Sequence, residues 1–250
     1  METFNIALPT SWPELSDKQL LMVYGLFAHD LSAAEVKALC LMKWNHFKVL
    51  ATLPRHRFLI KRGKEQVVLR VRQIQQATSV LDFLDSFAPM PIRIARIGKH
   101  RALPADFEKV PFEQYLFVDN LFQGYLNTQQ DELLLQMAQI LYRSDHVKPT
   151  RAHLIGIFYW MASLKQYFAG LFSNFYKPAG ANSDGNLLGG GQSDLYSQLR
   201  DSTNAMIRAL TGGDITKEAA IMKMDTWRAL TELDAKAREA EEIRKATKQS

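Results

Sequence analysis

The chain has 250 residues, of which 47% are hydrophobic and 23% are charged, and its formal net charge is +5. These values are close to the averages for soluble globular proteins, so a core can form without disulfides or metals. Cys40 is the single cysteine, which excludes an internal disulfide and fits a reducing cytosol. The length permits one large domain or two small ones.

Residues 11–50 are predicted to form two helices. The residues before them have neither a basic segment nor a long apolar run, so we expect no signal peptide. Ser16 with Gln19, and Ser32 with Glu35, are spaced as capping boxes, in which each side chain bonds the backbone N–H of the other residue. Apolar residues then recur at helical spacing in both segments.

Residues 57–71 are predicted to form a β-hairpin. Apolar and polar residues alternate on both sides of the turn Arg62-Gly63-Lys64. The residues expected to face the core are Phe58, Ile60, Leu69 and Val71, and Val67 belongs to the same alternation. Helical spacing resumes over residues 74–84, with Asp82 and Asp85 expected on a solvated helix edge. A second strand pair is expected around a turn at Gly98.

The first hairpin is also the centre of the positive charge. Residues 43–101 contain thirteen basic and three acidic residues, a balance of +10, and the rest of the chain is −5. Such an asymmetry indicates an acidic partner. Seven side chains are candidates for contact with an anion or a nucleic acid: Arg55, Arg57, Lys61, Arg62, Lys64, Arg70 and Arg72. The alternatives are a solvated face, a deterrent to strand-edge pairing and an acidic protein partner. We favour these alternatives together over nucleic acid because the rest of the chain is acidic.

Residues 111–179 are predicted to form an aromatic-rich helical core that packs with residues 1–110. Helical spacing is clear over residues 112–125, 131–143 and 150–176. The last segment is apolar nearly all round, which is typical of the central helix of a bundle. Its most apolar run has eleven residues, and a membrane span needs about 20, so we expect no membrane partner. Its aromatic side chains are expected in the core, with a ligand pocket as the alternative.

Residues 180–194 are predicted to be a flexible linker, because five of these fifteen residues are glycine. Residues 195–250 then form an amphipathic helical arm. We expect six apolar residues of the arm to anchor a protein partner, as an amphipathic helix does in a groove: Ile207, Leu210, Met224, Trp227, Leu230 and Leu233. The alternative is that the arm folds back and closes the core of its own domain.

Taken together, these elements predict a mainly α fold with a small antiparallel β part (α+β). It would contain a helical bundle, one or two β-hairpins and a C-terminal helical arm. The expected domains are a helical pair with the basic hairpin over 1–110, the aromatic-rich core over 111–179, the linker over 180–194 and the arm over 195–250.

No motif for catalysis or for a bound cofactor is found. Cys40 lies on the apolar side of a predicted helix, where a cysteine is usually inert, and there is no Gly-x-Ser-x-Gly elbow. No two of the six histidines have the i, i+4 spacing of metal ligands on one helix. The glycines at 189–191 lack the lysine of a phosphate-binding loop. We expect no catalytic residue, metal or cofactor, and keep an enzyme with a tertiary site as a third hypothesis.

Several longer strings carry a resemblance to known proteins. They include Pro-Phe-Glu-Gln-Tyr-Leu at 111–116, Phe-Tyr-Trp-Met-Ala-Ser-Leu-Lys-Gln at 158–166 and Asp-Thr-Trp-Arg-Ala-Leu-Thr-Glu-Leu-Asp at 225–234. These strings resemble uncharacterised proteins of Bacteroidetes bacteria and of their phages and prophages. The layout of the tail from Gly213 is similar to C-terminal segments of some phage tail-assembly proteins.

The resemblance implies a non-enzymatic phage or prophage protein that acts in virion assembly or structure, at the tail or the head–tail junction. Its partners would be phage structural proteins or further copies of itself, and its location would be the cytoplasm of the bacterial host or the virion. The alternative function is a nucleic-acid-binding protein that uses the basic hairpin of residues 55–72.

Overall fold

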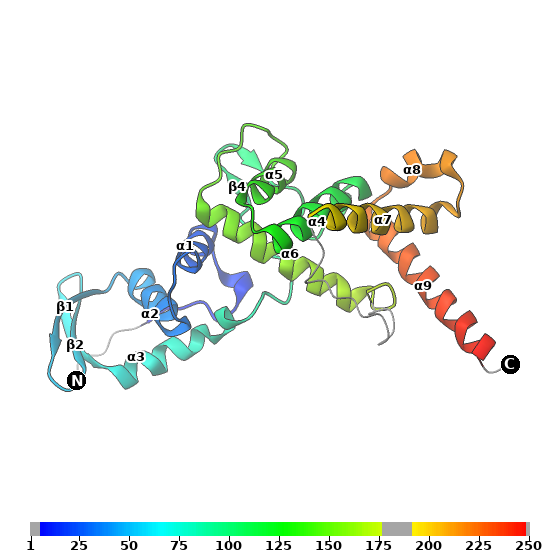
Figure 1. Ribbon diagram of the computed structural model, residues 1–250. Helices are drawn as coiled ribbons and strands as arrows, with labels where there is room; N and C mark the ends of the chain where they lie inside the picture. The colour runs from blue at the N-terminus through cyan, green and yellow to red at the C-terminus, as the bar shows by residue number, and fades with distance from the viewer. Residues whose placement is uncertain (1–5, 177–191, 249–250) are drawn as a thin grey trace. The chain divides into compact units, whose positions relative to one another are not determined.

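The computed structural model describes residues 6–176 and 192–248, and it is mainly helical with a small antiparallel β part, as predicted (Figure 1). The chain divides into two compact units. The first consists of Met1–Ile97 and Lys148–Ser163, and the second of Gly98–Val147 and Leu164–Ser250. Helix α6, Arg151–Leu171, belongs to both, because its N-terminal part contributes to the first unit and its C-terminal part to the second.

This division differs from the expected one. Residues 148–163 cluster with the N-terminal helices, and the segment after residue 192 clusters with residues 98–147 instead of standing alone. Most of the predicted linker, residues 180–194, lies outside the described residues. Its last three residues, 192–194, are the first of helix α7.

The first unit begins with the short 3-10 helix Trp12–Glu14 and helices α1, Asp17–Phe27, and α2, Ala33–Trp44. Both predicted capping boxes are present at the N-termini of α1 and α2. Tyr24 of α1 is 2% exposed and lies against α6. A Cβ on Gly156 of α6 would come within 2.7 Å of the Tyr24 ring, so only glycine permits this close approach.

The prediction that helix continues to residue 50 is wrong. Helix α2 ends at Trp44, and His46 adopts the left-handed conformation with φ of 55°. The chain then forms strand β1, Lys48–Leu53, which pairs antiparallel with β2, Arg57–Arg62. Pairing with a neighbouring strand outweighed the local helical spacing here, because strand preference depends on tertiary context.

The predicted basic hairpin is β2 with β3, Glu65–Arg70, and β1 makes it a three-stranded sheet of order β1-β2-β3. Ile60 is 1% exposed, and Phe58, Val67 and Leu69 pack on the same core cluster with Phe47. Val71, predicted on the strand, is instead the first residue of helix α3, Val71–Thr78, and is exposed. A 3-10 helix follows over Ser79–Asp85.

The predicted second hairpin is confirmed as a two-stranded sheet of β4, Arg96–Ile97, and β5, His100–Arg101. Gly98 lies in its turn with φ of 58°, a left-handed conformation that glycine adopts without steric cost.

The second unit is built from helices around an aromatic interior. They are α4, Phe112–Thr128; α5, Asp131–Leu141; the C-terminal part of α6; α7, Gln192–Thr211; a 3-10 turn, Ile215–Lys217; α8, Glu218–Met222; and α9, Thr226–Lys248. Phe107, Phe112 and Phe168 are fully buried in it. No helix within residues 6–176 and 192–248 is both long enough and apolar enough to cross a membrane.

Candidate nucleic-acid interface

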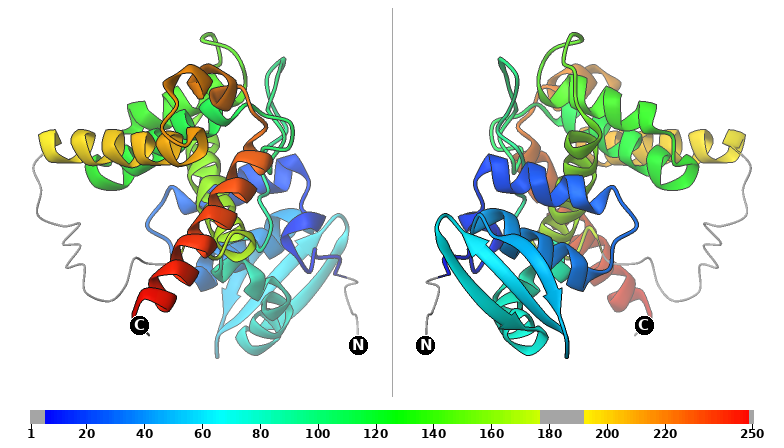
Figure 2. Two further views of the ribbon diagram at one scale, coloured as in Figure 1. Left: turned by 90° about the vertical axis from the view of Figure 1, so that its right-hand side faces the viewer. Right: turned by 90° about the vertical axis from the view of Figure 1, so that its left-hand side faces the viewer.

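The three-stranded sheet has one face against the core and one face that carries its charge. Side chains alternate between the two faces of a strand, and Ile60 and Phe58 fix which face of β2 is the core side. We call the opposite set the cationic face. The strand register places nine residues on it: Lys48, Ala51, Leu53, Arg57, Leu59, Lys61, Gln66, Val68 and Arg70. In the right-hand view of Figure 2 the sheet lies in front of α2, with no helix of the described residues before it.

The cations of this face form two cross-strand pairs. Lys48 lies opposite Lys61, and Arg57 lies opposite Arg70. Side chains directly opposite each other have Cβ atoms about 5 Å apart. Arg57 and Lys61 are four residues apart on β2, which separates the two pairs by roughly 14 Å at about 3.4 Å per residue. Between the pairs runs an apolar row formed by Ala51, Leu59 and Val68.

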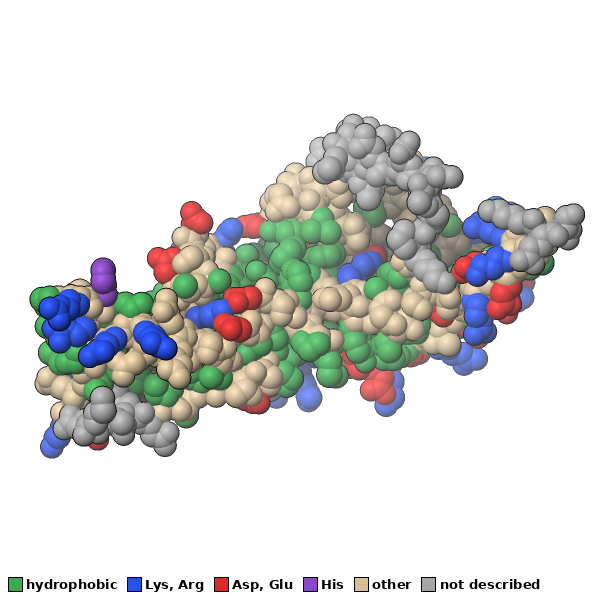
Figure 3. Space-filling view, turned by 90° about the horizontal axis from the view of Figure 1, so that it is seen from below, with side chains coloured by type: hydrophobic (Ala, Val, Ile, Leu, Met, Phe, Trp, Pro, Cys, Tyr) green, Lys and Arg blue, Asp and Glu red, His purple; other side chains and the backbone are tan. Residues whose placement is uncertain are grey.

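Like charges placed opposite each other destabilise a sheet, and nothing on this face offsets them. The register puts no aspartate or glutamate among its nine residues. Among the described residues, no ion pair involves any of its four cations. Arg57 donates through Nε to the Pro54 carbonyl at 3.0 Å, which orients its guanidinium without neutralising it. In Figure 3, Lys and Arg side chains gather at the left-hand end, over this sheet.

The structure divides the seven predicted basic residues. Three of them, Arg57, Lys61 and Arg70, share the cationic face. Arg62 has the parity of Ile60, pairs with Glu65 at 3.6 Å and lies 5.7 Å from the centre of the Phe47 ring. The other three lie beyond the strands: Arg55 and Lys64 in turns, and Arg72 on α3.

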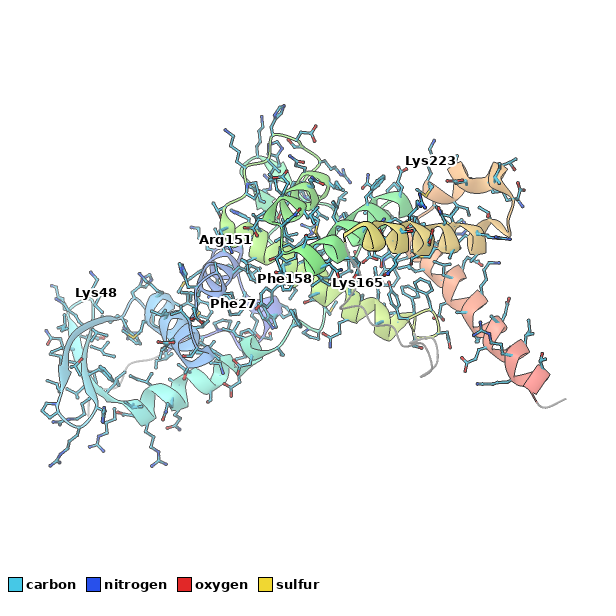
Figure 4. The ribbon with its side chains drawn as sticks, in the orientation of Figure 1. Phe27, Lys48, Arg151, Phe158, Lys165 and Lys223 are labelled. Atoms are coloured by element: carbon cyan, nitrogen blue, oxygen red, sulfur yellow. The ribbon has the colours of Figure 1, made fainter. Side chains whose placement is uncertain are left out.

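Lys48, labelled in Figure 4, is the cation of this face that was not predicted as a contact from the sequence. It lies at the start of β1 and is exposed. It was missed because a helix was expected there, although the segment Lys-Val-Leu-Ala-Thr-Leu after Phe47 has the β-branched and apolar content of a strand.

The six predicted partner anchors lie inside or against the second unit. Leu230 and Leu233 are 0% and 3% exposed. Trp227 donates through Nε1 to the Asp106 carbonyl at 2.8 Å and meets Phe168 edge to face at 5.8 Å. The other three, Ile207, Leu210 and Met224, are half-buried.

The expectation of an arm that offers all six residues to a partner is therefore corrected. Hydrogen bonds tie the arm to its own unit: the Phe112 N–H donates to the Met224 carbonyl at 2.8 Å, and the Thr226 side-chain Oγ1 donates to the Val110 carbonyl at 2.7 Å. The alternative of an arm that folds back describes this geometry, because the arm clusters with residues 98–147 and its Leu230 and Leu233 are buried there.

A polar cluster in the second unit holds the other notable ionisable groups. Lys165 pairs with Asp119 at 2.8 Å, and its ammonium lies 5.3 Å from the centre of the Tyr176 ring. The Tyr115 and Tyr176 hydroxyls are 2.6 Å apart. Burial, with the nearby Asp119 charge, raises the pKa of both tyrosines. Both phenols therefore stay protonated at neutral pH, which suits a structural network better than a base.

Cys40 also has the properties of a structural residue. It is 0% exposed, and burial raises the pKa of its thiol to about 12, so the reactive thiolate is scarce at neutral pH. Within the described part of the chain, no three His, Cys, Asp or Glu side chains come together as a metal site would require.

Comparisons of the chain with protein-family models, with curated proteins and with solved structures give no match. The resemblance to proteins of Bacteroidetes and their phages gains no support from them. The candidate interface therefore rests on the geometry of the sheet alone.

Proposed function

We propose that this protein is a non-enzymatic binding protein that holds the phosphate backbone of a nucleic-acid duplex on its cationic face. The proposal rests on one observation: two cross-strand pairs of cations lie on one face of the sheet, and no carboxylate lies among these four charges. Arginine and lysine are the usual contacts to phosphate oxygens, and arginine matches phosphate with two parallel hydrogen bonds.

The composition of the face favours a duplex over a single strand. Proteins that bind single strands without sequence preference stack the bases on aromatic side chains. The nine residues of the cationic face include no aromatic residue. Its central row, Ala51, Leu59 and Val68, has no polar side-chain group to bond a base edge, so the contact should be independent of sequence.

The proposal is tested by removing the four charges together. In the variant Lys48→Gln, Arg57→Gln, Lys61→Gln, Arg70→Gln, affinity for a random-sequence duplex at low salt, measured by fluorescence anisotropy, should fall by about 100-fold or more. A matched control removes four exposed cations of the second unit: Lys223→Gln, Arg228→Gln, Lys236→Gln, Arg244→Gln.

The control should bind as wild type does, although its net charge changes equally. If the wild-type protein binds no duplex at low salt, or if both variants lose affinity alike, the face is not the interface. Binding to acidic protein surfaces but to no duplex would favour the acidic protein partner instead.

A role in virion assembly stays a prediction. The six arm residues that were expected to anchor a partner are buried or half-buried within the second unit. It would need another surface of the protein.

A further inference from the structure

The first unit contains a second candidate site, which shares no residue with the cationic face. A cavity of about 340 Å³ is lined by the end of α1, by α2, by the end of the 3-10 helix Ser79–Asp85 with the two residues that follow it, and by α6. This is near the lower end of the roughly 300–1,000 Å³ range of small-molecule sites, so a ligand here would be small.

Three aromatic rings form one wall of the cavity. Tyr159 stands between the other two: its ring centre is 4.9 Å from that of Phe27 and 5.3 Å from that of Phe87. Phe27 is labelled in Figure 4. Phe87 is 42% exposed, and Phe27 and Tyr159 are half-buried, so part of each ring is accessible. The rings therefore offer π surface to a molecule in the cavity.

The charged groups beside this wall sum to a negative charge. Lys37 is 9% exposed and bonds two carboxylates, Asp82 at 2.6 Å and Asp85 at 2.5 Å. These aspartates were expected on a solvated helix edge, and they are 65% and 46% exposed at the end of the 3-10 helix; the sequence did not reveal their pairing with Lys37. Although burial opposes the charge of Lys37, its two carboxylate partners raise its pKa, so one cation faces two anions.

Asp85 lines the cavity and keeps an oxygen for a ligand. Its Oδ2 accepts from Lys37, while no described residue donates a hydrogen bond to its Oδ1. Its side chain is 46% exposed. An anion would be repelled by the excess carboxylate, whereas a cation would be attracted both by that charge and by the ring faces.

We propose that this cavity binds a small organic ammonium ion, with its methyl or methylene groups on Phe27, Phe87 and Tyr159 and its charge beside Asp85. Aromatic walls of this kind recognise quaternary ammonium groups because the ring face is electronegative and the alkyl groups are apolar. The site is separate from the cationic face, so this proposal does not depend on whether the protein binds nucleic acid.

The test uses choline as the probe and its uncharged carbon isostere, 3,3-dimethylbutan-1-ol, as the matched ligand. By isothermal titration calorimetry of the wild-type chain, choline should bind about 2- to 5-fold more tightly than the isostere, since cation–π attraction at a partly exposed site contributes about 0.5–1 kcal/mol. The amide of trimethyllysine, titrated in parallel, shows whether a free or a side-chain ammonium fits better. Absence of choline binding, or equal binding of the isostere, would overturn the proposal.

Two variants locate the site. Phe87→Leu and Asp85→Asn should each weaken choline binding several-fold. Phe117→Leu, an equally conservative change at a 59% exposed ring on α4, should leave it unchanged. Choline binding that is the same in all three variants would place the ligand elsewhere and contradict the assignment. The comparison of choline with its isostere needs no variant, so the proposal stays testable even if one variant fails to fold.

Discussion

The basic hairpin and the C-terminal helices are the two regions that the sequence predicted to bind a partner. The structure exposes the charges of the first and buries apolar residues of the second. The cationic face presents four charges on the side of the sheet away from the core. The apolar stripe of α9 turns inward, with Leu230 and Leu233 buried and Trp227 bonded to the Asp106 carbonyl. The cations of the face have no carboxylate beside them, whereas the apolar side chains of α9 are packed inside their own unit.

The difference follows from the physical chemistry of the two patterns. An apolar stripe can be buried against any apolar surface, because the hydrophobic effect is non-directional. The nearest such surface belongs to the same chain. Exposed charges on a strand stay hydrated unless an opposite charge pairs with them, and this face contains no opposite charge. The cost of placing like charges opposite each other is a reason to look for an anionic partner there.

The largest effect is expected from the buried stripe. Leu230→Ala should lower the free energy of unfolding by about 2–5 kcal/mol, because it leaves a cavity at a fully buried position. Ile243→Ala, on the same helix at a 67% exposed position, should change it by less than about 0.5 kcal/mol. Urea denaturation followed by circular dichroism measures both. Equal small effects would mean that α9 is not part of the core.

A smaller, pH-dependent effect is expected where α9 meets the residues after α6. Asp234 accepts from Asn174 Nδ2 at 2.9 Å and from the backbone N–H groups of Asn174 and Phe175 at 2.7 and 3.0 Å. Burial opposes its ionisation, but these hydrogen bonds outweigh burial and lower its pKa. A lowered folded-state pKa stabilises the protein above the unfolded-state value of about 3.9.

That contribution should disappear as the pH falls from about 4 through the lower folded-state pKa. Asp234→Asn should therefore destabilise the protein at pH 7 and have little effect in strong acid, as urea titrations at each pH would show. Glu232→Gln, at an exposed position on the same helix, is the control. A loss in Asp234→Asn that is the same at every pH would contradict the assigned role of the carboxylate.

The smallest change adds a charge to the apolar row of the cationic face. Val68→Lys, at a 41% exposed position, should make the dependence of log K on log salt steeper by about 0.9, the value for one further phosphate contact. Thr52→Lys places the same charge on the opposite face of the same sheet and should leave the slope unchanged. If both variants steepen it equally, net charge and not the face would account for binding.

Much of the fold could be predicted from local patterns. The two capping boxes, the alternation of β2 and β3, and the glycine turn of the second hairpin all depend on neighbours in sequence, and all are present. Strand β1 was missed because its pairing with β2 is a tertiary contact that helical spacing cannot reveal.

The candidate site was predictable only in part, for the same reason. Seven basic residues could be read from the sequence, but which of them share a face depends on the register. Whether the stripe around Trp227 faces the core or a partner depends on folding. The contact of Phe27 and Phe87 with Tyr159 joins three distant segments that no spacing rule connects.

The salt dependence of duplex binding tests the central claim most directly. Four phosphate contacts predict a slope of log K against log salt of about −3.6, which is a loss of about 150-fold in affinity between 50 and 200 mM salt. The variant that lacks Lys48, Arg57, Lys61 and Arg70 should lose this slope. A wild-type slope near zero, or the same slope in that variant, would contradict the account.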